Sequence, residues 1–444
     1  MRHILKISLS LLLLFSWVNT SLAIGNVYIQ NNTGLTLDLQ ITQYGDKQLD
    51  QGDEWGINST QLIPWQKKKK ALWYNRDSGI TWGKSFYFDT RISIDNQYIA
   101  TLQQKLKGTW RFSNLYHSVE GSDFSQGWSQ GYDILEDSFT VNGKQYQIKF
   151  SADYNVSTSS DDIIYALHEV TPYSLPSATS NQSLKVLSYN LYTILTNTAA
   201  DINRRMQALP EAIQGYDVIV FEEAFYNPAR EDLINNIASE YPYQTDILDT
   251  SGYLEDGGVF IASKWPIELE GQFKYDNCSG VDCLSPKGAV YAKVNKQGTP
   301  YHIFGSHLQA ENSSSAKAAR LAQLQELKDY IDLKNISASE AVIIAGDMNV
   351  DKLSSNQEYL DMLQALNASE PSLASYSHAY SDDDATNNMA SEQSWLDYVL
   401  YSDDHAQPTL SSEAVLVLKS NDDDMFDVWD YSDHYSVFGY FEFN

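Results

Sequence analysis

The sequence predicts an α+β protein: an all-β domain of sandwich type over residues 24–170, then a larger domain over residues 184–444 in which helices flank two packed sheets. Three observations predict this arrangement. Short alternating runs fill the first region, a stretch rich in Ser, Thr, Pro and Asn follows at 171–183, and apolar runs alternate with helical patterns in the second region. For a chain of 444 residues, two domains are also the default expectation.

The first 23 residues have the pattern of a secretory signal peptide. Arg2 and Lys6 precede an apolar run at 9–18, and small residues end at Ala23. This run is too short for a membrane-spanning helix, and no later stretch is apolar for long enough to form one. We therefore expect a secreted, extracellular mature protein that begins near Ile24.

Residues 24–170 have the pattern of short β-strands. Alternating runs, for example at 27–29 and 35–39, are separated by turns rich in Gly, Asn and Asp, without a helical period. Within this region, the stretch 65–74 combines four lysines with flanking aromatic residues. That pattern suits either contact with a membrane surface or a strand edge protected by lysine. We interpret the domain as an accessory module for membrane or lipid targeting, or for adhesion.

The region after the linker predicts buried strands with helices between some of them. Charged and amide residues cluster where several of these strands end, so we expect a site on the rim of the sheets, formed by strand ends and loops. The apolar runs lie at 186–187, 218–221, 259–261, 303–304 and 342–344, and the helical segments lie near 201–213, 229–239, 315–333 and 357–366.

Charge and cysteine content limit the function further. The formal net charge of −28 weighs against a protein that binds nucleic acid through a basic face. The chain contains two cysteines, Cys278 and Cys283, and in an oxidising compartment we expect them to form a local disulfide. Because the closed loop is so short, this bond is expected to pin a surface loop and to add only modest stability.

Two polar side chains follow predicted buried strands early in the second region. Asn190 ends the strand that begins at 184, and Glu223 follows the apolar run at 218–221. A carboxylate at such a place is costly to desolvate unless it meets a cation or a hydrogen-bond donor. Mg²⁺ prefers one or two carboxylates with water and phosphate oxygens, so the pair fits a magnesium site. The alternative is that Glu223 is an acidic residue at a helix N-terminus.

Asp347 and Asn349 follow the apolar run at 342–344. Side chains at i and i+2 at a strand end can point to one face. There they could position the attacking water, the water shell of a metal ion or a phosphate oxygen. The Gly-Asp-x-Asn pattern is also a common turn, which is the structural alternative.

Two histidines complete the set. His307 ends the predicted strand at 301–306, and His434 follows Asp433. Cleavage of a phosphodiester requires activated water and neutralisation of the growing negative charge. A neutral histidine suits the base and a protonated one suits the leaving-group side. A histidine beside a carboxylate can also be an ordinary hydrogen-bonded surface residue.

In this order, the residues resemble the deoxyribonuclease I-like superfamily of metal-dependent phosphoesterases, and within it the bacterial neutral sphingomyelinases. The resemblance covers nearly all of residues 184–444 and implies a four-layer α/β/β/α sandwich there, while residues 24–170 lie outside it. It is carried by nine ordered motifs: Ser188-Tyr189-Asn190, Glu223-Ala224-Phe225, 255–259, 263–267, Lys287-Gly288, 307–311, 346–350, Leu396-Asp397-Tyr398 and 432–435.

The resemblance implies a central Mg²⁺ site, in which Mn²⁺ or Co²⁺ could substitute. Glu223 would hold the ion with Asn190 nearby, while Asp347 and Asn349 would bind the metal-linked water and the phosphate. The implied central metal set is Glu223, Asn190, Asp347 and His434, and the implied phosphate-binding set is Asn190, Asn349 and His307.

Catalytic roles follow from the same resemblance. His434, oriented by Asp433, would be the general base that activates water, and Asp397 would support this cluster. His307 would stabilise the transition state or protonate the ceramide oxygen.

The resemblance also implies a second divalent-ion site at the edge of the cleft, formed by Asn227, Glu255 and Asp256. The superfamily places an acid beside its first histidine at the position of Asp256 as well, so either role is open for that residue.

Two departures from the family pattern stand out. The second cysteine of the family, after the His-Leu-Gln-Ala-Glu motif, is replaced here by Asn and Ser residues at 312–315, and Cys283 offers a local partner instead. The segment between 418 and 432 is shorter than the family's membrane-docking hairpin. It still contains Met425, Phe426 and Trp429, which suit insertion into a bilayer interface or packing onto the domain core.

The sequence therefore predicts a secreted, Mg²⁺-dependent sphingomyelin phosphodiesterase of the phospholipase C type, a toxin or haemolysin that acts as a monomer on host-cell membranes and binds no nucleic acid. A secreted deoxyribonuclease-type nuclease, or another phosphodiesterase of this fold, is the main alternative. A lipid-binding or pore-forming protein with an idle second domain and an inositol-phosphate phosphatase are further alternatives; the intact acidic and histidine residues and the lack of a basic cluster argue against them.

Overall fold

The structure is a computed structural model of the 444-residue chain, and part of the chain is left undescribed. The predicted signal peptide lies outside the described part, as does most of the predicted linker. The described residues are 24–64, 66, 69–110, 113–121, 127–129, 135–141, 144–153, 162–169, 176, 180–194, 201–249, 256–375, 377–378, 380–382, 393–420 and 430–444.

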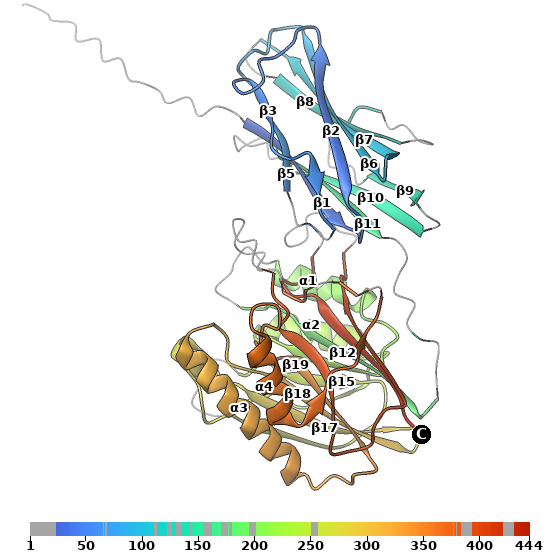
Figure 1. The fold of residues 1–444 in the computed structure, drawn as a ribbon, viewed down its shortest axis with the longest axis vertical. Helices are drawn as coiled ribbons and strands as arrows, with labels where there is room; N and C mark the ends of the chain where they lie inside the picture. Colours follow the sequence, from blue (N-terminus) through green and yellow to red (C-terminus); the bar gives the residue numbers. More distant parts are fainter. Residues whose placement is uncertain are drawn as a thin grey trace, which may run out of the picture. The chain divides into compact units, whose positions relative to one another are not determined.

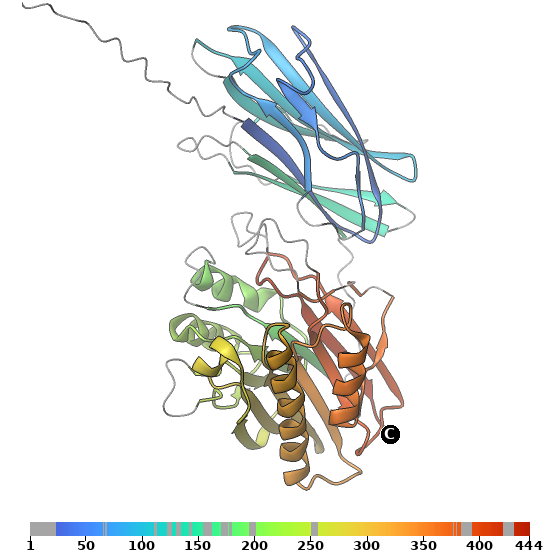
Figure 2. The ribbon, with the colours of Figure 1, turned by 60° about the vertical axis from the view of Figure 1, so that its left-hand side comes forward.

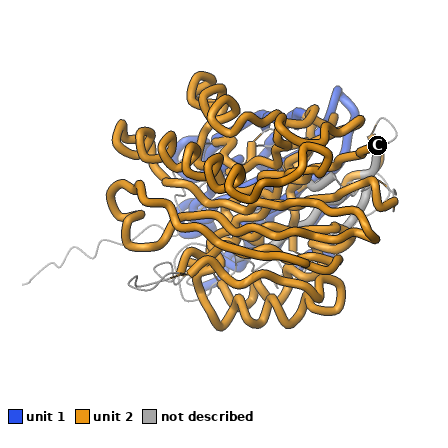
Figure 3. The backbone as a smooth tube through the Cα atoms, turned by 90° about the horizontal axis from the view of Figure 1, so that it is seen from below, with its two compact units in different colours: residues 1–31, 36–137, 152–166 blue, residues 32–35, 138–151, 167–444 orange. Residues whose placement is uncertain are grey.

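The chain divides into two compact units (Figure 3). The first contains residues 1–31, 36–137 and 152–166, and the second contains residues 32–35, 138–151 and 167–444. Each sheet nevertheless takes all its strands from one side of residue 180. The domain boundaries drawn from the sequence at 171–183 stay a prediction.

Among the described residues of 24–169, all the regular structure is β-strand (Figure 1), which confirms that the first region is β-rich. The strands are β1 (Ile24–Asn32), β2 (Leu37–Gly45), β3 (Trp55–Ile57), β4 (Gln61–Leu62), β5 (Lys69–Asn75), β6 (Ser85–Ile94), β7 (Gln97–Gly108), β8 (Ser113–Gly121), β9 (Leu135–Val141), β10 (Lys144–Asp153) and β11 (Asp162–Glu169). One sheet has the order β3-β5-β1-β11-β10-β9 and the other has the order β4-β2-β6-β7-β8.

Alternation along the strands explains how these two sheets pack. In β2, Leu37, Leu39 and Ile41 are buried, and the residues between them are exposed. Tyr74 of β5 stacks on Phe88 of β6 with ring centroids 4.9 Å apart, so the inner faces of the two sheets meet. The first region is therefore a sandwich of two sheets.

The second unit contains two further sheets. Their strands are β12 (Ser183–Asn190), β13 (Val218–Glu222), β14 (Tyr243–Gln244), β15 (Phe260–Ser263), β16 (Ile267–Lys274), β17 (Gly288–Lys296), β18 (Thr299–His307), β19 (Ala341–Asp347), β20 (Ala368–Ser369), β21 (Ser372–Leu373), β22 (Asp397–Ser402), β23 (Leu410–Leu416) and β24 (Ser436–Glu442). The seven-stranded sheet has the order β14-β15-β13-β12-β24-β23-β21, and the six-stranded sheet has the order β16-β17-β18-β19-β22-β20. They approach closely at Gly305 of β18, where an added Cβ would lie 2.6 Å from Val220 of β13.

Helices cover the outer faces of both sheets (Figures 1 and 2). The helices are α1 (Ile202–Ala208), η1 (Leu209–Glu211), α2 (Asn227–Ile237), η2 (Gly280–Leu284), α3 (Ser314–Leu333) and α4 (Asn356–Leu366). On the six-stranded sheet, Tyr330 of α3 packs edge-on against Phe304 of β18, and Tyr359 of α4 stacks on Tyr398 of β22. The predicted four-layer α/β/β/α sandwich is confirmed. None of the described helices has the length and apolar character needed to cross a bilayer.

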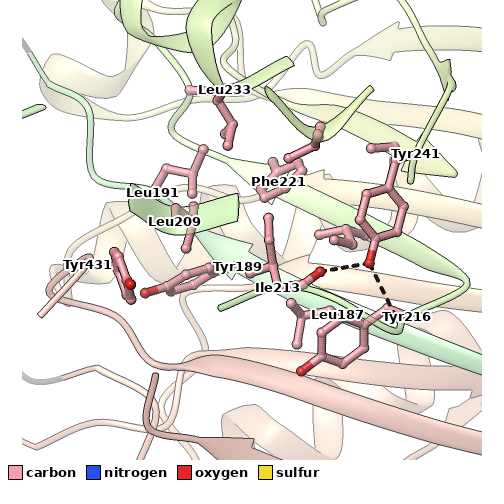
Figure 4. Packing of buried hydrophobic residues seen from close by; sticks show 14 of the residues in the cluster. Leu187, Tyr189, Leu191, Leu209, Ile213, Tyr216, Phe221, Leu233, Tyr241 and Tyr431 are labelled. Carbon is pink, nitrogen blue, oxygen red and sulfur yellow. Dashed lines mark hydrogen bonds between the residues drawn. The ribbon is translucent and has the colours of Figure 1, made fainter. Parts of the chain in front are cut away.

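A buried cluster attaches α1 and α2 to the seven-stranded sheet (Figure 4). Leu209 and Leu233 meet Leu187 and Phe221 in this cluster, so the helical faces and the sheet bury apolar surface together. Tyr241 is fully enclosed, and its hydroxyl donates to the carbonyl of Ile213 at 2.7 Å. The packing holds the outer helices against the strands whose ends carry the polar residues described next.

Candidate active site

Strand register brings the predicted site residues to one edge of each sheet. In the six-stranded sheet, β18 runs parallel to β19 with His307 opposite Asp347, and β19 runs antiparallel to β22 with Asp347 opposite Asp397. In the seven-stranded sheet, the parallel pair β12 and β13 places Asn190 opposite Glu222. His307 and Asp397, which are 90 positions apart in the sequence, therefore flank Asp347 at the same edge of the sheet.

Asn190 of one sheet joins Asp347 of the other. The Nδ2 atom of Asn190 donates to Oδ2 of Asp347 at 3.0 Å, and both residues are buried. The other Asp347 oxygen accepts from the backbone N–H of Asn349 at 2.9 Å. Asn349 itself has a left-handed φ of 51°, and its side-chain amide donates to the carbonyl of Leu308 at 3.1 Å. Asp347 is thus fixed at the centre of the group.

Glu223 lies beside Asp347 in a tight turn after β13, with a φ of 52°. Its Oε1 atom is 3.7 Å from Nε2 of His307, and its buried Oε2 atom has no hydrogen-bond partner among the described residues. Burial, followed by the nearby Asp433 carboxylate, raises the pKa of Glu223 to about 7. An unsatisfied carboxylate oxygen at such a position is costly unless a cation binds it.

His307 is buried and contacts a lysine. Nζ of Lys287 lies 2.7 Å from Nε2 of His307, and Oδ2 of Asp347 lies 3.5 Å from the same nitrogen. Burial, then the charges of Lys287 and His434, hold the pKa of His307 well below its usual range. His307 is therefore a neutral imidazole that accepts from Lys287 and carries its proton on Nδ1.

His434 lies across Asp347 from His307. Its Nδ1 is 2.9 Å from Oδ2 of Asp397, and its Nε2 is 4.0 Å from Oδ2 of Asp347 and 3.9 Å from Oδ1 of Asp382. Burial alone would lower the pKa of His434, but the carboxylates of Asp397 and Asp382 raise it well above its usual range. Burial also raises the pKa of Asp397 to about 6, against the opposing effect of His434.

Asp433 was expected to orient His434, but the hydrogen-bond contact with the ring comes from Asp397. Asp397 contacts Nδ1 of His434, whereas Asp433 accepts a hydrogen bond from the hydroxyl of Ser432 at 3.2 Å. Asp433 nevertheless lies near the ring, because one of its carboxylate oxygens, a ring nitrogen of His434 and an oxygen of Asp382 all lie within 4.8 Å of one another. Burial raises the pKa of Asp433 to about 6, and the nearby His434 opposes this rise.

Three functional candidates were not predicted from the sequence. Lys287 was noted only as part of a motif, although it contacts His307. Ser381 donates its hydroxyl to Oδ2 of Asp397 at 2.7 Å, and Asp382 faces His434 from the same loop. Both lie in an acid-rich part of the sequence, where neither strand nor helix periodicity provides a signal.

The predicted second ion site contains an arginine in addition. Its described members, Asn227 and Asp256, both contact the guanidinium group of Arg230, at 2.8 Å and 2.9 Å. Glu255 lies outside the described residues. The second ion site therefore stays a prediction, and Asn227 and Asp256 each already accept a hydrogen bond from a buried cation.

The predicted disulfide is confirmed, and its loop supports the site. Cys278 and Cys283 are bonded, with Cα atoms 5.4 Å apart. Within this loop, Asp282 lies 3.8 Å from Nζ of Lys287 and accepts from the backbone N–H of Ala310 at 2.7 Å. The predicted membrane-contact residues Met425, Phe426 and Trp429 lie outside the described residues.

The central residues fit a hard divalent cation. Glu223, His307 and Asp347 each bring one ligand atom within 4.8 Å of the others, and a second such group shares Asp347 with Asp397 and His434. The set consists of carboxylate oxygens and imidazole nitrogens, and one of those oxygens, Oε2 of Glu223, is buried without a partner among the described residues. This chemistry suits Mg²⁺ or Mn²⁺.

Comparisons with known proteins agree with this arrangement. The model of the endonuclease/exonuclease/phosphatase family matches residues 187–434. A sphingomyelinase C of Bacillus cereus is 36% identical over 299 residues, which are 59% of this chain and 89% of that protein. A sphingomyelinase C of Listeria ivanovii is 33% identical, over 59% of this chain and 87% of that protein.

Two solved structures are also similar. A variant of the beta toxin of Staphylococcus aureus, solved with bound magnesium ions, has 32% identity and a TM-score of 0.54 over 59% of this chain and all of that chain. The sphingomyelinase C of Streptomyces griseocarneus has 32% identity and a TM-score of 0.52, over 59% of this chain and 99% of that chain.

Proposed function

The chain belongs to the endonuclease/exonuclease/phosphatase family and is a phosphoric diester hydrolase, and from this premise we propose that it hydrolyses sphingomyelin to ceramide and phosphocholine with the help of a divalent cation. The observation that supports this most is the convergence of Glu223, His307, Asp347 and His434 at one edge of the sheets, in a chain whose relatives are sphingomyelinases.

His434 is the proposed general base. Its Nε2 atom faces Asp347 and, in the neutral form of the ring, can take a proton from water, while Asp397 on Nδ1 fixes the tautomer and stabilises the imidazolium that forms. The carboxylates around His434 raise its pKa, so the ring holds a transferred proton well. The water oxygen then attacks phosphorus, and the bond from phosphorus to the ceramide oxygen breaks.

Lys287 and His307 are proposed to act on the phosphate. Nζ of Lys287 lies 2.7 Å from Nε2 of His307, and the same nitrogen lies 3.5 Å from Asp347, so the N–H groups of Lys287 and of the neutral His307 ring belong to one cluster beside Asp347. These N–H groups can donate to phosphate oxygens as negative charge grows, or to the departing ceramide oxygen. Asn190 and Asn349 hold Asp347 from both sides and are proposed to help position the phosphate.

Glu223, Asp347 and their neighbours are the residues that would hold the cation. When bound, a divalent ion supplies positive charge that offsets the buried carboxylates and stabilises a phosphoryl transition state. We propose Mg²⁺, with Mn²⁺ or Co²⁺ as possible substitutes, because oxygen ligands dominate the set.

A nuclease with the same machinery is the alternative substrate class. The acidic residues Asp382 and Asp433 beside His434 would repel a polyanionic strand, which favours a substrate with a single phosphodiester. The deciding experiment compares phosphocholine release from sphingomyelin vesicles with cleavage of double-stranded DNA, both with Mg²⁺. We expect release from sphingomyelin and no DNA cleavage; DNA cleavage without phosphocholine release would refute the proposal.

Matched variants make this comparison sharper. His434→Ala should reduce phosphocholine release by about two or more powers of ten, as loss of a general base usually does. His405→Ala changes a half-buried histidine that contacts Ser402 outside the site, and it should leave the rate unchanged.

The first region is proposed to bring the enzyme to membranes after export. Two exposed tryptophans of the sandwich support this: Trp82 is 70% exposed and Trp110 is 79% exposed. Their rings meet edge-on at 6.2 Å, and the loops that carry them are joined by a hydrogen bond from the N–H of Gly83 to the carbonyl of Gly108. Tryptophan favours the membrane interface, so the pair suits contact with a bilayer.

A further inference from the structure

Arg230 is a buried cation at the edge of the candidate active site. Its residue surface is 8% exposed. One guanidinium nitrogen donates to the carbonyl of Ala224 at 2.6 Å and to Oδ2 of Asp256 at 2.9 Å, and the other terminal nitrogen donates to Oδ1 of Asn227 at 2.8 Å. Three oxygen atoms from two segments of the chain therefore point at one positive group.

These three acceptors are the kinds of atom that a hard divalent ion binds. They comprise a backbone carbonyl, a side-chain amide oxygen and a carboxylate oxygen, all of which occur in Ca²⁺ and Mg²⁺ sites. The second carboxylate oxygen of Asp256 is occupied as well, since it accepts from the backbone N–H of Gly258 at 3.0 Å. The hydroxyl of Ser285 donates to the backbone carbonyl of Asp256 at 2.8 Å, which fixes the loop further.

We propose that the guanidinium of Arg230 takes the place of a second divalent ion at this edge, so that the chain binds one such ion and not two. A guanidinium keeps its charge at all ordinary pH values and matches the carboxylate and amide geometry through fixed N–H groups. A divalent ion would have to displace it or lie beside a like charge in a nearly dry setting. The expected total of one bound ion rests on the proposed central site at Glu223. The proposal that Arg230 excludes a divalent ion from the edge does not rest on that site.

The arrangement also explains how the Glu223 turn is held. Ala224 follows Glu223 directly, its carbonyl accepts from Arg230, and its N–H donates to the carbonyl of Gly258 at 2.9 Å. Arg230 thus links α2, the loop before β15 and the turn that carries the proposed metal ligand. Arg230 is a positioning residue, and the turn stays ordered without a second ion.

The test measures the number of Mn²⁺ ions bound per chain, by titration followed with electron paramagnetic resonance. The wild-type protein should bind one ion. Arg230→Ser should bind a second, weaker ion, because it frees the oxygens of Asn227 and Asp256. The double variant Arg230→Ser/Asp256→Asn should lose that additional ion, and Arg230→Lys, which keeps a cation in place, should bind one ion.

Two results would overturn the proposal: a wild-type protein that binds two ions and loses one in Asp256→Asn, or a folded Arg230→Ser protein that gains none. If Arg230→Ser does not fold, Asp256→Asn alone still decides, because the proposal requires its count to stay at one. Glu223→Gln separates the two proposals. The Glu223→Gln variant should lose the ion of the central site, and this result tests the central site. The Arg230→Ser/Glu223→Gln variant should still bind an ion at the edge, and this result tests the proposal for Arg230.

Discussion

His434 is held by a carboxylate that lies 37 positions away in the sequence. Asp397 begins β22 and reaches Nδ1 of His434 at 2.9 Å, and Ser381 fixes the same carboxylate oxygen at 2.7 Å. This pairing orients the ring so that Nε2 faces Asp347. The adjacent Asp433 contributes charge to the surroundings of His434, but the contact belongs to Asp397.

The two aspartates therefore differ in their expected effect on catalysis. Asp397→Asn should lower kcat for phosphocholine release by about two or more powers of ten, because the amide no longer fixes the tautomer of His434 or stabilises its cation. Asp433→Asn should lower kcat by less. Steady-state rates on sphingomyelin vesicles measure both. Equal losses, with both variants folded by circular dichroism, would contradict the assignment of Asp397.

A second prediction concerns His378, a buried histidine outside the catalytic group. Burial and, to a smaller extent, the charge of Lys419 lower its pKa from 6.5 to about 3, partly opposed by a backbone hydrogen bond with Tyr380. The unfolded chain therefore binds more protons between these values. The contribution to stability is complete above pH 6.5 and is lost as the pH falls. Between pH 6.5 and 5.5 this amounts to about 1 kcal/mol.

His378→Phe keeps an aromatic ring against Tyr380 and Tyr435 and removes the titration. Urea unfolding at both pH values should show that the variant loses about 1 kcal/mol less stability than the wild type over this range. Parallel pH dependence in the two proteins would show that His378 does not titrate as described.

For the helices and strands, the sequence predicted where buried strands end, but it did not predict which side chains contact one another at those ends. The apolar runs before Glu223, His307 and Asp347 indicated where buried strands end. Pairing across sheets depends on tertiary packing, which a single sequence does not encode locally. Helix α2 starts at Asn227, earlier than the predicted 229, because Pro228 is tolerated in a first helical turn.

The role of Arg230 shows the same limit. Its position in α2 follows from the helical pattern, but its contact with Asp256 joins segments 26 residues apart. The acidic and amide oxygens were predicted from the sequence, but nothing in the sequence indicated that a guanidinium group would contact them. Lys287 was likewise visible as a residue and not as a partner of His307.

The disulfide loop is predicted to matter more for activity than for stability. Asp282 in this loop approaches Lys287, and Lys287 contacts His307. Because the closed loop has only a five-residue separation, removing the bond should cost about 2 kcal/mol of stability or less. Cys278→Ser/Cys283→Ser should therefore remain folded but lose several-fold in kcat.

Thermal unfolding and phosphocholine release measure the two effects. Asp282→Asn in the intact disulfide protein is the matched variant, since it weakens the same contact with Lys287 and leaves the loop closed. If both variants release phosphocholine at the wild-type rate, the loop does not influence His307.

At the scale of the whole molecule, the fold class and the two kinds of structure were predicted from periodicity. Alternation indicated the strands before residue 170, and longer apolar runs with helices indicated the layered second region. The exposed pair Trp82 and Trp110 was not predicted, because exposure depends on how the loops fold. The sequence pointed instead to the lysine-rich stretch 65–74 as a candidate for membrane contact. This stretch is only partly described, and Lys69 and Lys70 lie in β5.

The tryptophan pair is expected to contribute to membrane binding. Trp82→Ala/Trp110→Ala should bind sphingomyelin vesicles about tenfold more weakly, because two interfacial side chains are lost. Hydrolysis of a soluble phosphodiester should not change. Leu333→Ala, which removes a side chain that is 73% exposed at the end of α3, is the control and should bind normally. Vesicle sedimentation measures the binding, and unchanged sedimentation of the double variant would exclude the pair.

The central claim is that Glu223, Asp347 and the two histidines work around one divalent cation. Phosphocholine release from sphingomyelin vesicles in excess chelator, and again after Mg²⁺ is restored, tests it most directly. The account predicts that release stops in chelator and returns with Mg²⁺. An equal rate in chelator would contradict it.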